Sequence, residues 1–166
     1  MGYYLGLDVG SVSTNFVLLD KEGKVVWDLY LRTEGRPLVA IEKGLGELAK
    51  ENPKVLGAGT TGSGRKLAGV LIGADVIKNE ITAHAVAALA LVPSVQTVLE
   101  IGGQDSKLII LRDGVVTDFA MNTVCAAGTG SFLDHQAARL GVPIEEFGKL
   151  ALKAKEEVRI AGRCAV

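Results

Sequence analysis

Alternating runs of hydrophobic and polar residues predict three strands and a helix in the first fifty residues. Residues 3–9 are almost continuously apolar, which is typical of a buried strand. Residues 15–20 and 24–32 predict two further strands, joined by a tight turn at residues 21–23. Arg36-Pro37 then opens a helix that ends before Asn52-Pro53. Its apolar residues recur at the spacing of one core-facing stripe, namely Leu38, Ile41, Leu45 and Leu48.

The following stretch predicts one more strand and two helices. Residues 54–58 form the strand, and Gly57 to Gly64 form a glycine-rich loop after it. Helices are expected at residues 65–72 and 79–92, the second of which ends at Pro93. Three antiparallel strands followed by helix, strand and helix predict a ribonuclease-H-like α/β unit.

The same order of elements then begins again. Strands are predicted at residues 97–101, 107–111 and 115–121, and a helix follows at about 131–140. The repeat is one of architecture and not of residues. The second copy lacks a final strand and helix, and the chain stops inside a motif. We therefore expect a duplicated ribonuclease-H-like α/β fold, with one half in residues 1–94 and a truncated second half in residues 95–166.

Composition narrows the class of protein. The 166 residues are 48% hydrophobic and carry a formal net charge of −1, with basic residues scattered along the chain, so we expect no nucleic-acid partner. No signal peptide is recognisable, and the longest apolar run, residues 85–92, is too short to cross a bilayer, so we expect no membrane association. Two distant cysteines form no disulfide framework; as reduced thiols they indicate the cytoplasm.

Two turns occupy equivalent places in the two copies. The first spans Leu7 to Thr14 and the second spans Glu100 to Lys107; each joins small residues to an acid at the end of a buried strand. Glycine lets a backbone approach a phosphate closely, and a carboxylate there can hold Mg²⁺, usually through water. A single turn of this kind usually has only a structural role and binds no phosphate. Two turns in matching positions favour a site that holds a triphosphate between two halves.

The Gly57 to Gly64 loop permits two other interpretations. GAGTTG matches the GxGxxG dinucleotide pattern, but it follows a fourth strand and does not open a βαβ unit. Residues 59–64 approach a P-loop, but Arg65-Lys66 stands where Lys-Ser/Thr is required. We therefore expect a flexible loop near the nucleotide or a partner surface.

The two cysteines stand in similar settings. Cys125 is followed by Ala-Ala-Gly-Thr-Gly and the start of a helix, and Cys164 lies in Ala-Gly-Arg-Cys-Ala. An isolated cysteine is by default a small buried hydrophobe. The small neighbours argue for a ligand role here. Two thiolates are too few for one iron–sulfur cluster, which takes four, but a symmetric homodimer supplies four.

Three other side chains have competing interpretations. His84 lies in an alanine-rich helix, and we expect its side chain to be packed or to cap the helix in preference to acting as a base. For His135 a surface role is favoured over one near a cluster. For Lys107 the sequence favours neither of two interpretations: its side chain reaches a phosphate, or it occupies an outward strand position.

Four motifs together resemble one family. They are LGLDVGSVSTN (residues 5–15), TVLEIGGQDSK (97–107), NTVCAAGTGSFLD (122–134) and AGRCAV (161–166). They are similar to the ATPase activators of 2-hydroxyacyl-CoA dehydratases and benzoyl-CoA reductases, the BadF/BadG/BcrA/BcrD-type family within the superfamily of sugar kinases, heat-shock chaperones and actin. The resemblance covers essentially the whole chain.

The resemblance implies an ATPase that injects a low-potential electron into a CoA-ester dehydratase or reductase. It implies ATP/ADP and Mg²⁺ in the two turns, an electron donor that is a ferredoxin or flavodoxin, and one 4Fe–4S cluster per homodimer with Cys125 and Cys164 as ligands. The residues implicated in catalysis are Asp8, Gln104 and Asp105, and those implicated in nucleotide binding are Gly10, Ser11, Val12, Ser13, Gly102, Gly103 and Gln104. Two alternatives stay open: a small-molecule kinase of the same superfamily and a non-catalytic regulatory module.

Overall fold

The first sheet of the computed structural model has five strands in the order β3-β2-β1-β4-β5, and the structure describes residues 2–122 and 128–158. β1 (Gly2–Val9), β2 (Ser13–Leu19) and β3 (Val25–Arg32) are antiparallel neighbours. β4 (Lys54–Thr61) pairs with β1 in parallel, and the short β5 (Val76–Ile77) pairs with β4 in parallel. This arrangement confirms the predicted ribonuclease-H-like unit.

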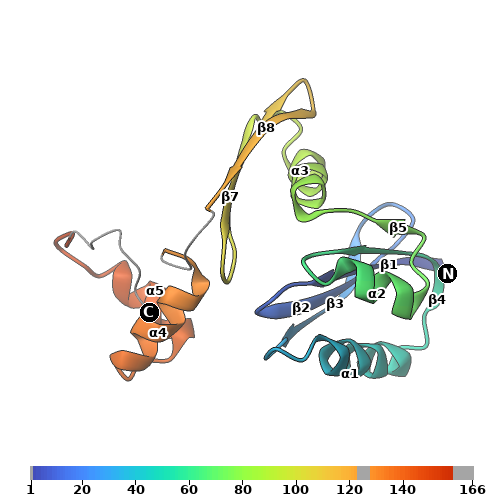
Figure 1. Ribbon diagram of the computed structural model, residues 1–166, viewed down its shortest axis with the longest axis horizontal. Helices are drawn as coiled ribbons and strands as arrows, with labels where there is room; N and C mark the ends of the chain where they lie inside the picture. Colours follow the sequence, from blue (N-terminus) through green and yellow to red (C-terminus); the bar gives the residue numbers. More distant parts are fainter. Residues whose placement is uncertain (1, 123–127, 159–166) are drawn as a thin grey trace.

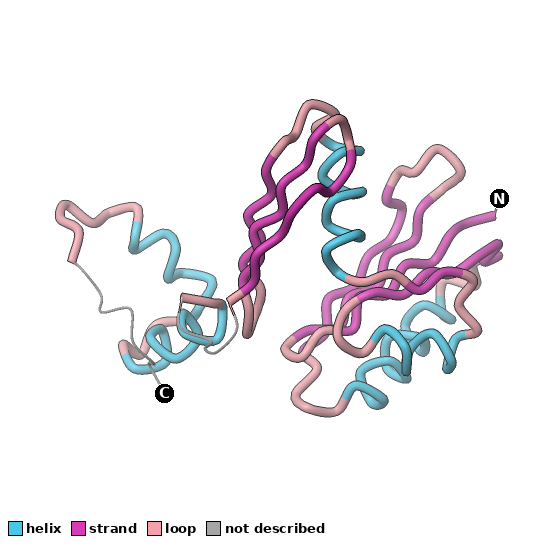
Figure 2. The backbone as a smooth tube through the Cα atoms, turned by 45° about the horizontal axis from the view of Figure 1, so that its top comes forward, coloured by secondary structure: helices cyan, strands magenta, loops and turns pink. Residues whose placement is uncertain are grey.

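Two helices cover one face of this sheet. α1 (Pro37–Lys50) and α2 (Arg65–Ile72) lie on the same side of the strands (Figures 1 and 2). Alternate residues of the strands point towards them, because the side-chain period of a strand is two. The shared core contains Leu7 of β1, Phe16 of β2, Ile41 of α1 and Ala68 of α2, all at most 2% exposed.

The second sheet has three antiparallel strands and its own core. β6 (Thr97–Ile101), β7 (Ser106–Arg112) and β8 (Val115–Met121) are paired in that order. α3 (Glu80–Leu91) packs against them through Ala85, which joins Ile109 and Leu111 in a small core (Figure 1). Asn79 caps α3, since its side chain accepts a hydrogen bond from the N–H of Thr82 at 2.8 Å.

Two helices follow the second sheet, α4 (Gly130–Arg139) and α5 (Ile144–Ala151). The duplicated α/β arrangement expected from the sequence is thus present. The predicted boundary at residue 94 stays a prediction, and α3, which precedes it, shares its core with the second sheet. Over the described residues, no helix combines the length and the apolar character needed to cross a bilayer.

Several local predictions were wrong. Residues 57–61 are the end of β4 and not part of a loop, and neither β5 nor α5 was predicted. In α1, Leu38 is 53% exposed, whereas Ala40 and Gly44 are buried. The helix rests on small residues because it lies very close to the sheet: a Cβ on Gly44 would be 2.1 Å from the ring of Phe16.

Candidate functional site

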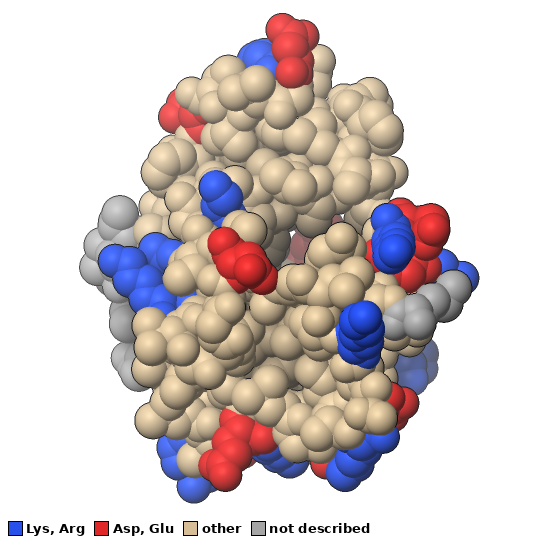
Figure 3. All heavy atoms as spheres, turned by 90° about the vertical axis from the view of Figure 1, so that its right-hand side faces the viewer, with Lys and Arg blue, Asp and Glu red and all other residues tan. Residues whose placement is uncertain are grey.

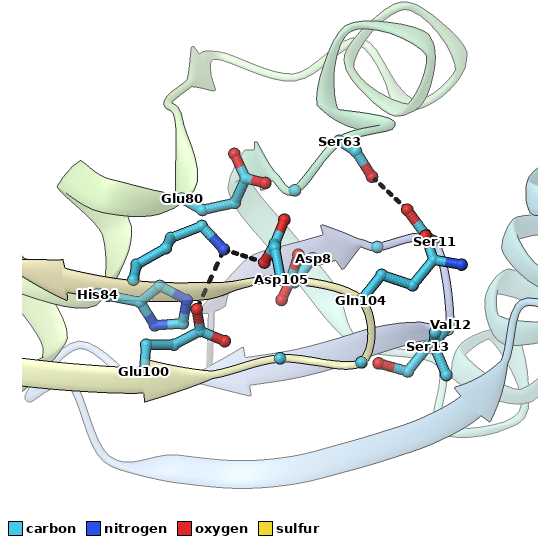
Figure 4. A pocket seen from close by; sticks show the side chains of 15 residues that line it. Asp8, Ser11, Val12, Ser13, Ser63, Glu80, His84, Glu100, Gln104 and Asp105 are labelled. Atoms are coloured by element: carbon cyan, nitrogen blue, oxygen red, sulfur yellow. Dashed lines mark hydrogen bonds and ion pairs between the residues drawn. The ribbon is translucent and has the colours of Figure 1, made fainter. Parts of the chain in front are cut away.

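A pocket lies where the turn between β1 and β2 meets the turn between β6 and β7. It contains about 560 Å³ of free space, part of it open to solvent. Figure 4 shows side chains from both turns and from α3 pointing towards one another around it. The lining residues come from four separate segments and are Asp8, Gly10, Ser11, Val12, Ser13, Gly62, Ser63, Glu80, His84, Glu100, Gly102, Gly103, Gln104, Asp105 and Lys107.

All residues that the sequence assigned to catalysis or nucleotide binding line this one pocket. Asp8 and Asp105, 97 positions apart, belong to the two equivalent turns, and Gln104 stands beside Ser11 in Figure 4. The two turns are in direct contact, because a Cβ on Gly103 would lie 2.5 Å from a methyl group of Val12. The absence of a side chain at Gly103 thus allows the two turns to close around one space.

The turns offer backbone N–H groups to a ligand. Among hydrogen bonds between described residues, none uses the N–H of Ser11, Val12, Gly103 or Gln104. The neighbouring groups are paired within each turn: Gly10 donates to the carbonyl of Ser13, and Gly102 donates to that of Asp105, both at 2.8 Å. Successive unpaired N–H groups on a turn form a concave donor surface that suits an anion such as a phosphate.

Carboxylates dominate the rest of the pocket. They belong to Asp8, Glu80, Glu100 and Asp105. Lys107, only 6% exposed, donates from Nζ to Glu100 Oε2 at 3.0 Å and to Asp105 Oδ1 at 2.5 Å. Its pKa is raised: burial lowers it, but the hydrogen bonds to the two carboxylates more than offset that effect. The outward position considered for Lys107 is therefore wrong.

The carboxyl group of Asp8 also has a shifted pKa. Its pKa is raised above the ordinary 3.8 because burial removes the carboxylate from water, and the nearby Glu80 and Glu100 add to the effect. His84 and Lys107 act in the opposite direction and do not reverse it. A carboxyl group of this kind is a better proton acceptor than a fully solvated one.

α3 brings two residues that the sequence reasoning had not assigned to the pocket. Glu80 and His84 are one helical turn apart, so they lie on the same face of α3. Glu80 also pairs with Arg65 of α2 at 3.5 Å. His84 does not cap the helix, since Asn79 does. The signal available in the sequence was the placing of two ionisable residues, four apart, in a helix otherwise nearly free of charge.

Gly62 and Ser63 close the pocket from the β4 side. Gly62 has φ +88°, and a Cβ there would lie 2.4 Å from Asp8 Oδ1. Ser63 is hydrogen-bonded to Ser11 at 3.4 Å. This segment thus lies beside the two turns, and it is shorter as a loop than predicted, because β4 extends to Thr61.

The second turn is tied to the start of α4. The N–H groups of Gly130 and Ser131 donate to the carbonyls of Gly102 and Gly103, each at 2.9 Å, and Thr129 Oγ1 donates to Gly103 at 3.0 Å. On the other side of the turn, the N–H of Ser106 donates to the side chain of Asn122 at 2.7 Å. The residues that flank segment 123–127 are therefore both anchored to the second turn.

The predicted metal ligands Cys125 and Cys164 lie outside the described residues. Within residues 2–122 and 128–158, no group of three or more His, Cys, Asp or Glu side chains is arranged to hold a metal ion. His135, on α4, is exposed. Its neighbour Asp134 forms an ion pair with Arg32 of β3 at 3.0 Å.

A family model described as the BadF/BadG/BcrA/BcrD ATPase family matches residues 5–166. The chain is 36% identical to the (R)-2-hydroxyglutaryl-CoA dehydratase activating ATPase of Acidaminococcus fermentans, and the alignment covers 99% of this chain and 64% of that protein. It is 32% identical to the 2-hydroxyisocaproyl-CoA dehydratase activator of Clostridioides difficile, over 99% and 62%. The chain thus spans less than two thirds of the length of these relatives.

Solved structures are similar over nearly the whole chain. The activator of 2-hydroxyisocaproyl-CoA dehydratase from Clostridium difficile, with bound ADPNP, superposes with a TM-score of 0.82 at 33% identity, covering 98% of this chain and 61% of that one. Component A of the Acidaminococcus fermentans (R)-2-hydroxyglutaryl-CoA dehydratase gives a TM-score of 0.80 at 35% identity, covering 99% and 64%.

Proposed function

The chain belongs to the BadF/BadG/BcrA/BcrD ATPase family, and from this membership we propose that it hydrolyses ATP to drive a low-potential electron into a 2-hydroxyacyl-CoA dehydratase or a related CoA-ester reductase. The observation that carries the proposal is the pocket between the two glycine turns. It combines unpaired N–H donors with a group of carboxylates, as a phosphate-binding site with an associated cation requires.

The two turns would share the nucleotide's phosphates. The first turn, Gly10 to Ser13, would contribute the N–H groups of Ser11 and Val12, and the second, Gly102 to Gln104, would contribute those of Gly103 and Gln104. ADPNP, bound to the Clostridium difficile activator, is a nucleotide of the class that such a pair of turns accepts. Because the turns belong to different sheets, a ligand that contacts both favours one relative position of the two sheets.

The carboxylates fit a magnesium ion held largely through water. Mg²⁺ keeps several of its waters in protein sites, so a preformed cage of three or more side chains is not needed. Asp8 and Asp105 are the residues that would hold its hydration shell; when bound, the ion supplies positive charge against the phosphates. Gln104 would orient an attacking water, and Asp8, whose pKa is raised, would accept a proton from it.

We assign the electron-carrying centre to Cys125 and Cys164. Two thiolates per chain supply four in a homodimer, which is the ligand number of one 4Fe–4S cluster. The supporting feature is a set of hydrogen bonds to the second turn from both sides of the Cys125 segment. Asn122 makes them on one side, and residues 129–131 make them on the other. A ferredoxin or flavodoxin in the cytoplasm would supply the electron.

The test uses the full-length protein, purified and reconstituted with iron and sulfide without oxygen. We expect an ATPase that is a dimer with about four irons, and a cluster whose EPR spectrum changes on addition of ATP. Cys125→Ala is expected to lose the iron and keep the ATPase. Phosphate transfer from ATP to a small molecule, with equal rates in Cys125→Ala and the parent, would instead establish the kinase alternative. Nucleotide binding without hydrolysis would establish the regulatory module.

A further inference from the structure

Lys107 is the buried cation of the pocket. It is the second residue of β7 and the last residue of the second turn, and its side chain is 6% exposed. Its ammonium group is shared between Glu100 of β6 and Asp105 of the turn, at 3.0 and 2.5 Å. In Figure 4 the two ion pairs are the dashed lines that end on the labelled Glu100 and Asp105. Lys107 thus bridges the strand before the turn and the turn itself.

The charges around Lys107 are unbalanced. Asp8, Glu80, Glu100 and Asp105 all line the pocket, whereas Lys107 is the one lysine or arginine among its described lining residues. Arg65 pairs with Glu80 from outside that lining. Phosphate groups are negative as well, so like charges would meet inside a partly desolvated space, where screening by water is weak.

We propose that Lys107 is a positioning residue, which holds the Glu100 and Asp105 carboxylates together and cancels enough of their charge for nucleotide phosphates to enter with a divalent cation. The inference rests on the proposed nucleotide site and adds to it a specific requirement, the charge balance set by Lys107. A lysine that contacted phosphate directly would have its donors free, whereas two of the three donors of Lys107 are directed at carboxylates.

The charge balance can be tested by removing the lysine alone or together with one partner. In Lys107→Met, Glu100 and Asp105 lose their shared cation. We expect ADP binding in the presence of Mg²⁺ to weaken at least tenfold, and binding with the metal chelated to weaken further. In Lys107→Met/Glu100→Gln one negative charge is removed with the positive one. Affinity is then expected to return to within about threefold of the parent, because the balance is restored.

Isothermal titration calorimetry of the full chain with ADP, with Mg²⁺ or with EDTA, measures these affinities directly. Lys21→Met, at an exposed turn far from the pocket, is the matched control and should bind as the parent does. Lys107→Arg keeps the charge; it serves as the second variant if Lys107→Met does not fold, and should stay within about fivefold. Unchanged affinity in Lys107→Met overturns the inference. A double variant as weak as Lys107→Met also overturns it, in favour of direct phosphate contact. A parent protein that binds no ADP instead refutes the nucleotide site itself.

Discussion

Gly62 shows how a single residue decides the geometry of the pocket. It combines a left-handed backbone, φ +88°, with contacts that leave no room for a side chain: a Cβ would lie 2.4 Å from Asp8 Oδ1 and 2.5 Å from the carbonyl oxygen of Val9. Glycine is the residue that tolerates both conditions. The neighbour for which this glycine leaves room is Asp8, whose partly buried carboxyl group has a raised pKa.

Gly62→Ala is expected to destabilise the protein by about 2–4 kcal/mol, since it adds a steric clash to the strain of a positive φ. Gly23→Ala provides the matched control: Gly23 has φ +81°, but a Cβ added to it would have no other atom within 4 Å. That variant should lose only about 1 kcal/mol. Thermal unfolding of both variants measures the difference. Equal losses would show that the contact with Asp8 is unimportant.

Asp8→Asn is expected to raise the melting temperature at pH 7 and to reduce ATP hydrolysis at least tenfold. The raised pKa of Asp8 means that folding favours the protonated form. Its stabilising contribution is complete below the ordinary pKa of 3.8 and is lost as the pH rises through the folded-state value. The gain from Asp8→Asn should therefore disappear as the pH falls towards 4. Unfolding scans across pH, with exposed Asp28→Asn as control, test this sign.

At the scale of elements, the close approach of α1 to the first sheet shapes the first core. Ala40, Ile41, Gly44 and Leu48 form its buried face, and the helix axis comes near enough to β2 for Gly44 to lie under Phe16. Phe16 is itself 2% exposed and belongs to the buried core, so its ring is enclosed by other side chains. α4 is held in place differently, by hydrogen bonds from its first turn to the carbonyl groups of Gly102 and Gly103.

Gly44→Ala and Gly46→Ala are expected to have opposite effects, although they lie in the same helix. Alanine favours the helix by up to about 1 kcal/mol in both cases. A Cβ at Gly44 would overlap the Phe16 ring at 2.1 Å, so a net loss of about 1–3 kcal/mol is expected there. Gly46 has nothing within 4 Å and should gain stability. Urea unfolding of both variants decides the matter; a gain in both would refute the close packing.

At the scale of the whole molecule, the protein has two separate hydrophobic cores, and the parts that contain them are in contact at the two turns. The first core lies under the five-stranded sheet, and the second lies between α3 and the three-stranded sheet. Apart from the turns, Arg32 of β3 and Asp134 of α4 join parts of the chain 102 positions apart. Figure 3 shows one face of the molecule, where small groups of acidic and basic residues are separated by uncharged surface.

Arg32→Ala is expected to cost at most about 1 kcal/mol, because both partners are partly exposed, at 45% and 34%, and water screens the pair. The charge-reversed double variant Arg32→Asp/Asp134→Arg should regain most of that loss at low salt, and the difference should vanish near 1 M NaCl. Thermal unfolding at the two salt concentrations is the measurement. A loss above about 2 kcal/mol that is insensitive to salt would contradict a screened surface pair.

Much of the secondary structure could be predicted, because strands and turns depend on neighbouring residues. β6 and β8 have the predicted bounds, and both turns of the pocket were recognised from glycines and acids after buried strands. The predictions of secondary structure and burial failed where packing between distant segments determines the outcome. The length of β4 depends on its pairing with β1, and the buried face of α1 depends on the sheet beneath it.

The sequence by itself determined the order of the elements other than β5 and α5, the duplication and the two glycine turns, since each of these is encoded in short-range periodicity and in the conformational freedom of glycine. Only the tertiary structure decided which side chains share the pocket. Glu80 and His84 reach it because α3 crosses to the second sheet, and Lys107 becomes buried because Glu100 and Asp105 enclose its ammonium group. Such groupings depend on contacts between distant segments, and no local pattern of residues specifies them.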